Sequence, residues 1–234
     1  MIAEAIAARD WEAIGVELDR EGWTVLPGLL TPEQCRWLAG LDTKNDLFRK
    51  RIDMARHSYG RGRYAYFAYP LPGPVAEMRT AFYPPLATVA NRWNTAMGID
   101  RSYPGTHAEF LELCHGAGQA RPTPLLLRYS PSDYNRLHQD LYGDHVFPLQ
   151  VAILLSQPGT DFTGGEFVLT EQRARMQSRA DVVPLAQGDA VIFAVREHPV
   201  RGSRGTSRAH LRHGVSRLRS GERLTLGIIF HDAA

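Results

Sequence analysis

The sequence has little cysteine and no long hydrophobic run. Its two cysteines, Cys35 and Cys114, are too few for a disulfide framework and lack the spacing of a metal site. No stretch approaches the roughly 18 apolar residues that a membrane span requires, and the N-terminus lacks an uninterrupted apolar signal region. These absences predict a cytoplasmic protein that has no membrane partner.

The net charge is also small. The 27 lysines and arginines are nearly balanced by 25 aspartates and glutamates, which leaves a formal charge of +2. This balance neither requires nor excludes a nucleic-acid partner, so the distribution of arginine matters more than its total. The chain has 234 residues, of which 44% are hydrophobic, and this size suits one domain with a single core. We therefore expect one domain over residues 1–234.

The first half of the chain carries helix signals. Apolar residues recur at helical spacing in 3–20, and a capping box with proline at the first helical position opens 31–42. A third helix is predicted over 74–97, where Pro84-Pro85 should kink or break it, and a second capping box runs from Thr106 to Glu109. Residues 1–120 are therefore predicted to be mainly helical support, with the segment 49–70 lying between the predicted helices.

From about residue 123 the pattern changes to short β-runs separated by Gly, Pro and Asp. The runs lie at 123–129, 146–155, 165–170, 189–195 and 222–230. Helices followed by closely spaced strands predict an α+β fold, in which a β-sandwich or barrel over 121–234 is supported by helices on one side.

The strongest chemical feature is the triplet His138-Gln139-Asp140. Residues i and i+2 of an extended segment point to the same face, so one imidazole and one carboxylate can reach one metal ion without distorting the backbone. Two histidines and one carboxylate on Fe(II) leave positions open for a bidentate 2-oxo acid and O2. A second histidine must therefore come from elsewhere, because a His-X-Asp triplet alone occurs by chance in many proteins.

His213 is the best candidate for this second histidine. It precedes an alternating run in which Arg223 and Thr225 share one strand face while apolar residues share the other. A buried arginine beside the metal site is suited to pair bidentately with the distal carboxylate of a cosubstrate. The metal site is therefore predicted to include His213 and to lie next to Arg223.

Other histidines compete for the same role. Arg208 follows His198 by ten residues, as Arg223 follows His213, but no β-run follows His198 that would carry Arg208 into a barrel interior. His210 lies three positions before His213 and would face the other side of a strand. We expect His145 to be an exposed turn residue and His231 to be an exposed residue at a strand end.

Four motifs follow one another in the β-rich half. They are Arg128-Tyr129-Ser130-Pro131 leading to Leu137-His138-Gln139-Asp140, then Gly188-Asp189-Ala190-Val191-Ile192-Phe193, His213-Gly214-Val215 and Arg223-Leu224-Thr225-Leu226. In this order they resemble the motifs of the 2-oxoglutarate/Fe(II) dioxygenase superfamily. Among its members, the sequence is most similar to the AlkB-type nucleic-acid dealkylases.

The resemblance implies a double-stranded β-helix, or jelly roll, with the metal at the mouth of the barrel. It implies an enzyme in which His138, Asp140 and His213 hold Fe(II), with 2-oxoglutarate and O2 as cosubstrates and with stimulation by ascorbate. Arg223, Thr225 and Tyr129 fall where such enzymes bind 2-oxoglutarate. The alternative for Tyr129 is a half-buried strand aromatic without a ligand.

The segment 49–70 interleaves positive charge with aromatic residues. Cations suit phosphates and aromatic faces suit unstacked bases, as expected where an enzyme extrudes a base or grips a single strand. The segment also resembles the nucleotide-recognition lid of AlkB-like enzymes. Its predicted substrate-binding residues are Arg56, Tyr59, Tyr64 and Tyr66.

A second basic element lies between Phe193 and Arg219. With its glycines it reads as a mobile loop that reaches the metal and neutralises phosphates. The alternative is a solvated arginine-rich loop without a ligand. The arginines are Arg196, Arg201, Arg204, Arg208, Arg212, Arg217 and Arg219, and only Glu197 opposes them.

The sequence departs from the AlkB pattern at two positions. Many AlkB-like enzymes carry a second arginine six residues after the cosubstrate arginine, where this chain has Ile229. Two residues after the metal aspartate, where some members carry an acidic residue, this chain has Tyr142. Cosubstrate anchoring and base specificity are therefore expected to differ.

Three functions remain open. The first is oxidative dealkylation of alkylated DNA or RNA, in which an N-linked methyl group is hydroxylated and the product collapses to formaldehyde and the repaired base. The second is hydroxylation of a protein side chain or a small metabolite, for which the same iron site would serve. The third is a non-catalytic metal-binding jelly roll, but such a protein would not need Arg223 beside the metal site. No particular protein partner is indicated.

Overall fold

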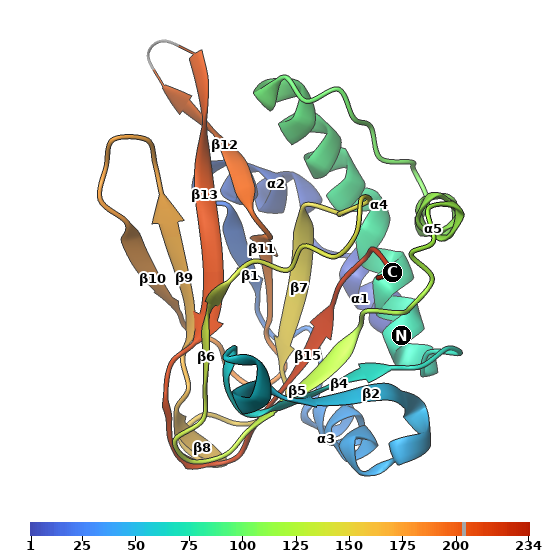
Figure 1. Cartoon of the computed structure of the whole chain (residues 1–234), viewed down its shortest axis with the longest axis vertical. Coiled ribbons are helices and arrows are strands. Elements are labelled where there is room, and N and C mark those ends of the chain that lie inside the picture. Colours follow the sequence, from blue (N-terminus) through green and yellow to red (C-terminus); the bar gives the residue numbers. More distant parts are fainter. Residues whose placement is uncertain (203–204) are drawn as a thin grey trace.

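Two antiparallel β-sheets form the body of the computed structural model, which describes residues 1–202 and 205–234 (Figure 1). The larger sheet has seven strands, in the order β1 (Trp23–Leu26), β11 (Ala190–Ala194), β7 (Leu149–Leu154), β15 (Arg223–Ile228), β5 (Leu125–Tyr129), β4 (Arg63–Phe67) and β2 (Phe48–Asp53). The smaller sheet has the order β10 (Arg179–Val183), β9 (Phe167–Gln172), β13 (Gly205–Val215), β6 (Tyr134–His138) and β3 (Gly60–Arg61), and β12 (Glu197–Gly202) also pairs with β13. A separate short pair joins β14 (Leu218–Gly221) to β8 (Phe162–Gly164).

The two sheets pack against each other through apolar side chains. Val191 and Phe193 of the larger sheet pack with Phe167 and Leu169 of the smaller one. A second cluster joins Tyr129 and Leu154 of the larger sheet to Val215 of the smaller one. Because successive side chains of a strand point to opposite faces, each strand sends alternate residues into this interface. The fold is thus an α+β jelly roll, as predicted.

Helices cover the other face of the larger sheet. They are α1 (Ile2–Ala7), α2 (Trp11–Glu21), α3 (Pro32–Gly40), α4 (Gly73–Met97) and α5 (His107–Gly116), with 3-10 turns at Leu41–Thr43, Asn45–Leu47 and Met54–His57. Residues from α1, α3 and α4 share one hydrophobic cluster with Leu226 and Ile228 of β15. The alternation in β15 explains this packing, because Leu226 and Ile228 face the helices while Arg223 and Thr225 face the smaller sheet. Among the described residues, no helix is long and apolar enough to cross a membrane.

The helix predictions need two corrections. The predicted helix 3–20 is two helices, because Asp10 caps the start of α2 with a hydrogen bond from the Ala13 amide. Of the predicted kink or break at Pro84-Pro85, the break does not occur, since α4 continues through both prolines. Phe82 and Leu86, on either side, are fully buried in the core, and this packing offsets the lost backbone hydrogen bonds.

The prediction that residues 1–120 are helical support was partly wrong. Four strands, β1 to β4, lie in that half, and three of them complete the larger sheet. The segment 49–70, predicted to be a substrate lid, mostly forms β2, β3 and β4, and its role as a lid stays a prediction. The short runs Trp23–Leu26 and Arg63–Phe67 were missed because each is stabilised by pairing with a distant strand.

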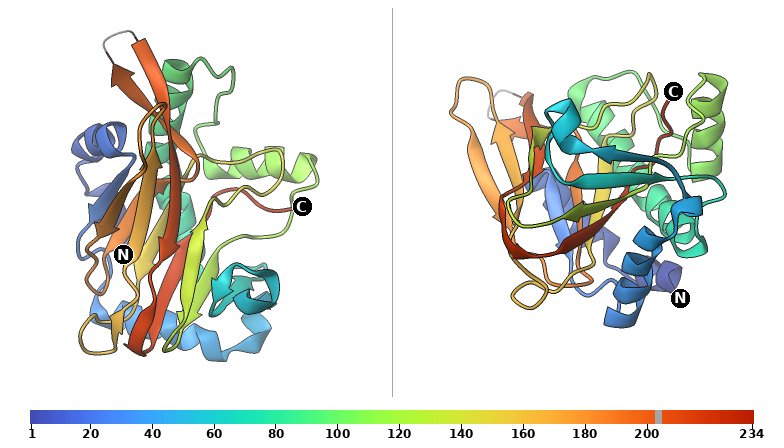
Figure 2. Two further views of the ribbon diagram at one scale, coloured as in Figure 1. Left: turned by 60° about the vertical axis from the view of Figure 1, so that its left-hand side comes forward. Right: turned by 60° about the horizontal axis from the view of Figure 1, so that its bottom comes forward.

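The predicted mobile loop between Phe193 and Arg219 was also wrong. Most of it forms the antiparallel strands β12 and β13, which extend past the other strands at one end (Figure 2). Arg204 lies outside the described residues. Arg201, Arg208 and Arg212 are exposed, and Arg208 forms a salt bridge of 3.2 Å with Glu197.

Candidate active site

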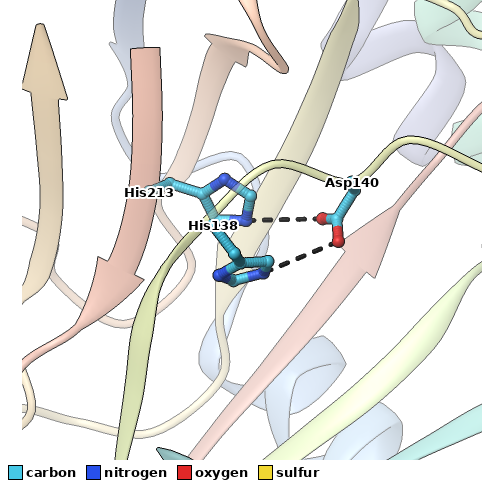
Figure 3. Close-up of side chains that lie close together, drawn as sticks. All are labelled: His138, Asp140 and His213. Atoms are coloured by element: carbon cyan, nitrogen blue, oxygen red, sulfur yellow. Dashed lines mark ion pairs between the residues drawn. The ribbon is translucent and has the colours of Figure 1, made fainter. Parts of the chain in front are cut away.

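Strand pairing brings the two predicted histidines together. His138 ends β6 and is the direct cross-strand partner of His213 in β13. Their ring centroids are 4.2 Å apart. Asp140 follows β6 by two residues and turns its carboxylate toward both rings (Figure 3). Its Oδ1 lies 3.5 Å from His138 Nε2 and its Oδ2 lies 3.4 Å from His213 Nε2.

These three side chains offer the donor atoms of a metal centre. One ligand atom from each lies within 4.8 Å of the others. His138 Nδ1 lies 2.7 Å from the Arg136 carbonyl oxygen, which can only accept, so this nitrogen carries the proton and the Nε2 lone pair is left for a metal ion. Two imidazoles and one carboxylate on one side of a cavity fit a divalent iron that keeps open positions.

Two neighbouring side chains hold the Asp140 carboxylate. The Tyr142 hydroxyl donates to Oδ1 at 2.8 Å, and Gln150 Nε2 donates to Oδ2 at 3.0 Å. Neither role follows from the sequence motifs. Tyr142 was recognised only as a departure from the AlkB pattern, and Gln150 lies in β7, where its inward direction was the only available signal.

The electrostatics of the site favour ionised Asp140 and neutral His138. Burial opposes ionisation of Asp140, but His213, His138 and the Gln150 hydrogen bond outweigh it and hold its pKa well below the usual range. Burial, followed by the proximity of His213, lowers the pKa of His138. Burial and the Asp140 charge raise the pKa of Tyr142 far above its usual value, so its hydroxyl keeps its proton. An ionised Asp140 and a neutral His138 are the forms in which these two side chains bind a metal ion.

A buried arginine and a buried tyrosine lie next to this centre. Arg223 in β15 is the direct partner of Tyr129 in β5, and both are almost fully buried. The Arg223 Nη1 donates to Thr225 Oγ1 at 2.6 Å, whereas Arg223 Nε and the Tyr129 hydroxyl have no partner among the described residues. Burial lowers the pKa of Arg223 to about 10. Unpaired donors around a buried positive charge suit the carboxylate of a ligand.

A cavity of about 410 Å³ connects all these groups. Its volume lies in the range of small-molecule sites. Tyr59, Tyr64 and Tyr66 line it, as do the metal-site residues, Arg223, Thr225 and Tyr129. Arg56 does not line it, since its side chain is 81% exposed and lies 3.9 Å from Asp53. The structure thus brings together every predicted site residue except Arg56.

The competing histidines lie elsewhere. His198 is buried and pairs with Glu171 at 3.1 Å, and Arg208 is exposed as expected. His210 is exposed on the face of β13 opposite His213. The expectation for His231 was wrong: it is fully buried, and its Nδ1 accepts a hydrogen bond from the Phe147 amide. Arg79 holds the segment just before it in the core, because its guanidinium donates to the carbonyl oxygens of Ile229 and Phe230.

Solved structures share this fold. An oxidoreductase of the 2-oxoglutarate/Fe(II) oxygenase family from Burkholderia pseudomallei superposes with a TM-score of 0.56 at 14% identity, covering 97% of this chain and 93% of that one. A prolyl-4-hydroxylase from Pseudomonas putida gives 0.51 at 17% identity over 100% of both chains. The α-ketoglutarate-dependent epimerase SnoN of nogalamycin biosynthesis gives 0.54 at 14% identity, over 93% of this chain and 80% of that one. At these identities the likeness is one of fold.

Sequence comparison defines the class and then the family. The protein is an oxygenase with the fold of the 2-oxoglutarate/Fe(II) oxygenases. Residues 62–233 match the model of the Oxygenase-NA family, described as an oxygenase catalysing oxidative methylation of damaged DNA, and the chain belongs to this family. The uncharacterised protein Rv2227 of Mycobacterium tuberculosis is 49% identical over 174 residues, which cover 74% of this chain and 75% of that protein.

Proposed function

We propose that the protein removes alkyl groups oxidatively from bases of DNA or RNA, with His138, Asp140 and His213 holding Fe(II) in a single oxygenase domain over residues 1–234. The observation that carries the proposal is the convergence of these three side chains on one cavity, which also contains a buried arginine that forms no salt bridge among the described residues. The family description, which names damaged DNA, supports the nucleic-acid substrate. The two free cysteines are consistent with action in the cytoplasm.

Arg223 binds the distal carboxylate of 2-oxoglutarate in this proposal. Thr225 orients the guanidinium, and the Tyr129 hydroxyl donates the second hydrogen bond. When bound, Fe(II) with 2-oxoglutarate and O2 supplies the oxidation, in which one oxygen atom enters succinate as CO2 leaves and the other enters an N-methyl C–H bond. The resulting N-hydroxymethyl group releases formaldehyde, and its proton returns to the base nitrogen.

The tyrosine wall of the cavity receives the base. Tyr64 and Tyr66 point inward from β4 at a T-shaped ring distance of 5.4 Å, and Tyr59 stands at the mouth with 52% of its surface exposed. Aromatic faces of this kind stack on an unpaired base. Exposed arginines such as Arg61 and Arg63 flank this wall and are suited to phosphates. Arg56 remains a candidate phosphate contact on the surface, outside the cavity.

The proposal is tested by following two products. Anaerobically purified protein receives Fe(II), 2-oxoglutarate and ascorbate, then O2, with a methylated single-stranded oligonucleotide, its unmethylated twin, or none. We expect formaldehyde only with the methylated strand and no turnover by Asp140→Ala. Tyr64→Ala should lose formaldehyde while retaining slow succinate production, and Trp37→Ala, which removes an exposed aromatic of α3 outside the cavity, should match the wild type.

Two results would redirect the proposal. Succinate that is formed equally with and without oligonucleotide would retain the oxygenase chemistry and point to a protein or metabolite as substrate. Unchanged turnover by Asp140→Ala would exclude the proposed metal site.

A further inference from the structure

We infer that Tyr142 is a positioning residue that links the substrate wall of the cavity to the metal carboxylate, through a hydrogen-bond chain from Tyr66 to Tyr142 to Asp140. The inference rests on the proposed assignment of Asp140 as a metal ligand. It adds two residues whose hydroxyl groups set the strength of metal binding.

The direction of the hydrogen bonds carries the inference. The Tyr142 hydroxyl has one proton, and it donates this proton to Asp140 Oδ1 at 2.8 Å. Its oxygen can then only accept, and the Tyr66 hydroxyl donates to it at 3.2 Å. Donors arranged in series polarise one another, so the hydrogen bond that reaches Asp140 is stronger when Tyr66 is in place.

The backbone around Tyr142 is fixed by a buried glutamine. Gln119 is 1% exposed, and its Nε2 lies 3.1 Å from the Tyr142 carbonyl oxygen and 2.7 Å from that of Asp232. Its Oε1 accepts from the His145 amide at 2.8 Å. Gly143 has a φ of +79°, and a Cβ there would lie 2.3 Å from the Gln119 side chain. The turn is therefore built around Gln119, which holds Tyr142 in place before any ligand binds.

Tyr66 is also held from outside the metal site. Its side chain is 7% exposed, and the Arg49 guanidinium lies 4.6 Å from its ring centroid. Arg49 is itself anchored, since its Nε donates to the Pro122 carbonyl oxygen at 2.9 Å. The hydrogen-bond chain thus begins on β4, whose inward side chains form the proposed wall for the base.

Gln150 and Tyr142 each donate a hydrogen bond to a different oxygen of the Asp140 carboxylate. Gln150 holds Oδ2 and Tyr142 holds Oδ1, so the plane of the Asp140 carboxylate is fixed by two donors from separate parts of the chain. Loss of either donor frees the carboxylate to rotate. Removing partners of metal ligands typically weakens metal binding about 10- to 100-fold.

The test measures Co(II) affinity and the visible spectrum of bound Co(II) in the full chain, without 2-oxoglutarate. The variants are Asp140→Ala, Tyr142→Phe, Tyr66→Phe and the double Tyr66→Phe/Tyr142→Phe. Tyr83→Phe is the matched control, because its hydroxyl is buried in the helical core without a partner among the described residues. Thermal melts of the apo proteins establish that each variant folds.

We expect Tyr142→Phe to weaken Co(II) binding about 10-fold and to alter the spectrum. Tyr66→Phe alone should weaken it about threefold, a loss typical of one neutral hydrogen bond. In the double variant Tyr66→Phe should add nothing, because its effect passes through Tyr142. Tyr83→Phe should bind like the wild type.

The outcomes separate the inference from the proposed function. If Asp140→Ala binds Co(II) as the wild type does, the metal site itself is wrong and the inference falls with it. If Asp140→Ala loses Co(II) but Tyr142→Phe matches the wild type within twofold, only the inference is overturned. Additive effects of the two tyrosine substitutions would also overturn it, because the hydroxyls would then act independently.

Discussion

Replacing Arg223 by methionine should stabilise the protein without ligand while abolishing its response to 2-oxoglutarate. Arg223 is 2% exposed, and its only hydrogen bond among the described residues goes to Thr225. Its charge therefore lacks the carboxylate partner that a buried guanidinium ordinarily has. Methionine is of similar length, is uncharged, and fills irregular apolar space.

The pKa of Arg223 gives the magnitude. One pKa unit corresponds to about 1.4 kcal/mol, so lowering by burial from the ordinary 12.5 to about 10 indicates a cost of about 3 kcal/mol for the charged form at neutral pH. Replacing Arg223 removes this cost but also removes the hydrogen bond to Thr225, which lowers the free energy of unfolding by about 1 kcal/mol. The net increase of about 2 kcal/mol in the free energy of unfolding corresponds to a Tm increase of about 4–8 °C in a chain of this size.

The assay is a thermal melt with Mn(II), with and without 2-oxoglutarate. At about 100 times its Kd, 2-oxoglutarate should stabilise the wild type by about 2.7 kcal/mol, or about 5–11 °C, and should not shift Arg223→Met. Arg79→Met is the matched control, because Arg79 is equally buried but pairs with Asp232 at 2.7 Å. Breaking that pair should destabilise the protein by about 3–5 kcal/mol.

The two methionine substitutions should therefore change the free energy of unfolding in opposite directions. A strongly destabilised Arg223→Met would mean that the guanidinium stabilises the fold, and it would refute the assignment of Arg223 as a ligand-binding residue that costs stability when no ligand is bound. A 2-oxoglutarate shift that survives in this variant would place the cosubstrate elsewhere.

Three further predictions concern the buried polar groups. Burial, followed by the charge of Arg79, lowers the pKa of His231 to about 4. The free energy of unfolding should therefore be greatest above the unfolded pKa of about 6.5 and should fall by up to about 3 kcal/mol as the pH approaches 4. His231→Asn should flatten this dependence in urea titrations, and an equal slope would contradict it. Tyr129→Phe should leave the Tm unchanged and raise the KM for 2-oxoglutarate about 2- to 10-fold; an unchanged KM would remove Tyr129 from the site. Gly62→Ala should destabilise the protein by about 1–3 kcal/mol in urea titrations, because φ is +123° and the new Cβ would lie 2.9 Å from the Tyr129 ring. A variant as stable as the wild type would show that the ring can move aside.

The site was predictable where spacing alone sets direction. His138 and Asp140 face one way because they are two residues apart, and Arg223 and Thr225 share the inner face of β15 for the same reason. The alternation also placed Leu226 and Ile228 against the helices. These predictions needed only local geometry, and the structure brings all four polar side chains to one cavity. Their roles in binding stay predictions.

What depends on distant pairing was not predictable. His138 pairs directly with His213 because 205–215 form strand β13, whereas the arginine-rich composition of this segment had indicated a loop. Gln150 lies in an otherwise apolar strand, and its contact with Asp140 exists only once β7 faces β6 and β13. His231 was expected at the surface, but its burial depends on core packing that no local pattern encodes.

The order of the larger sheet bears on how fragments of this protein would behave in solution. Its two outermost strands, β1 and β2, both precede residue 62, where the match to the family model begins. A fragment starting there would retain the cavity's main polar residues but would leave β11 and β4 with unpaired backbone groups along their full lengths. Exposed edges of this kind recruit strands from other molecules. Such a fragment should therefore self-associate, because it would lack the two strands that cover both edges of the larger sheet.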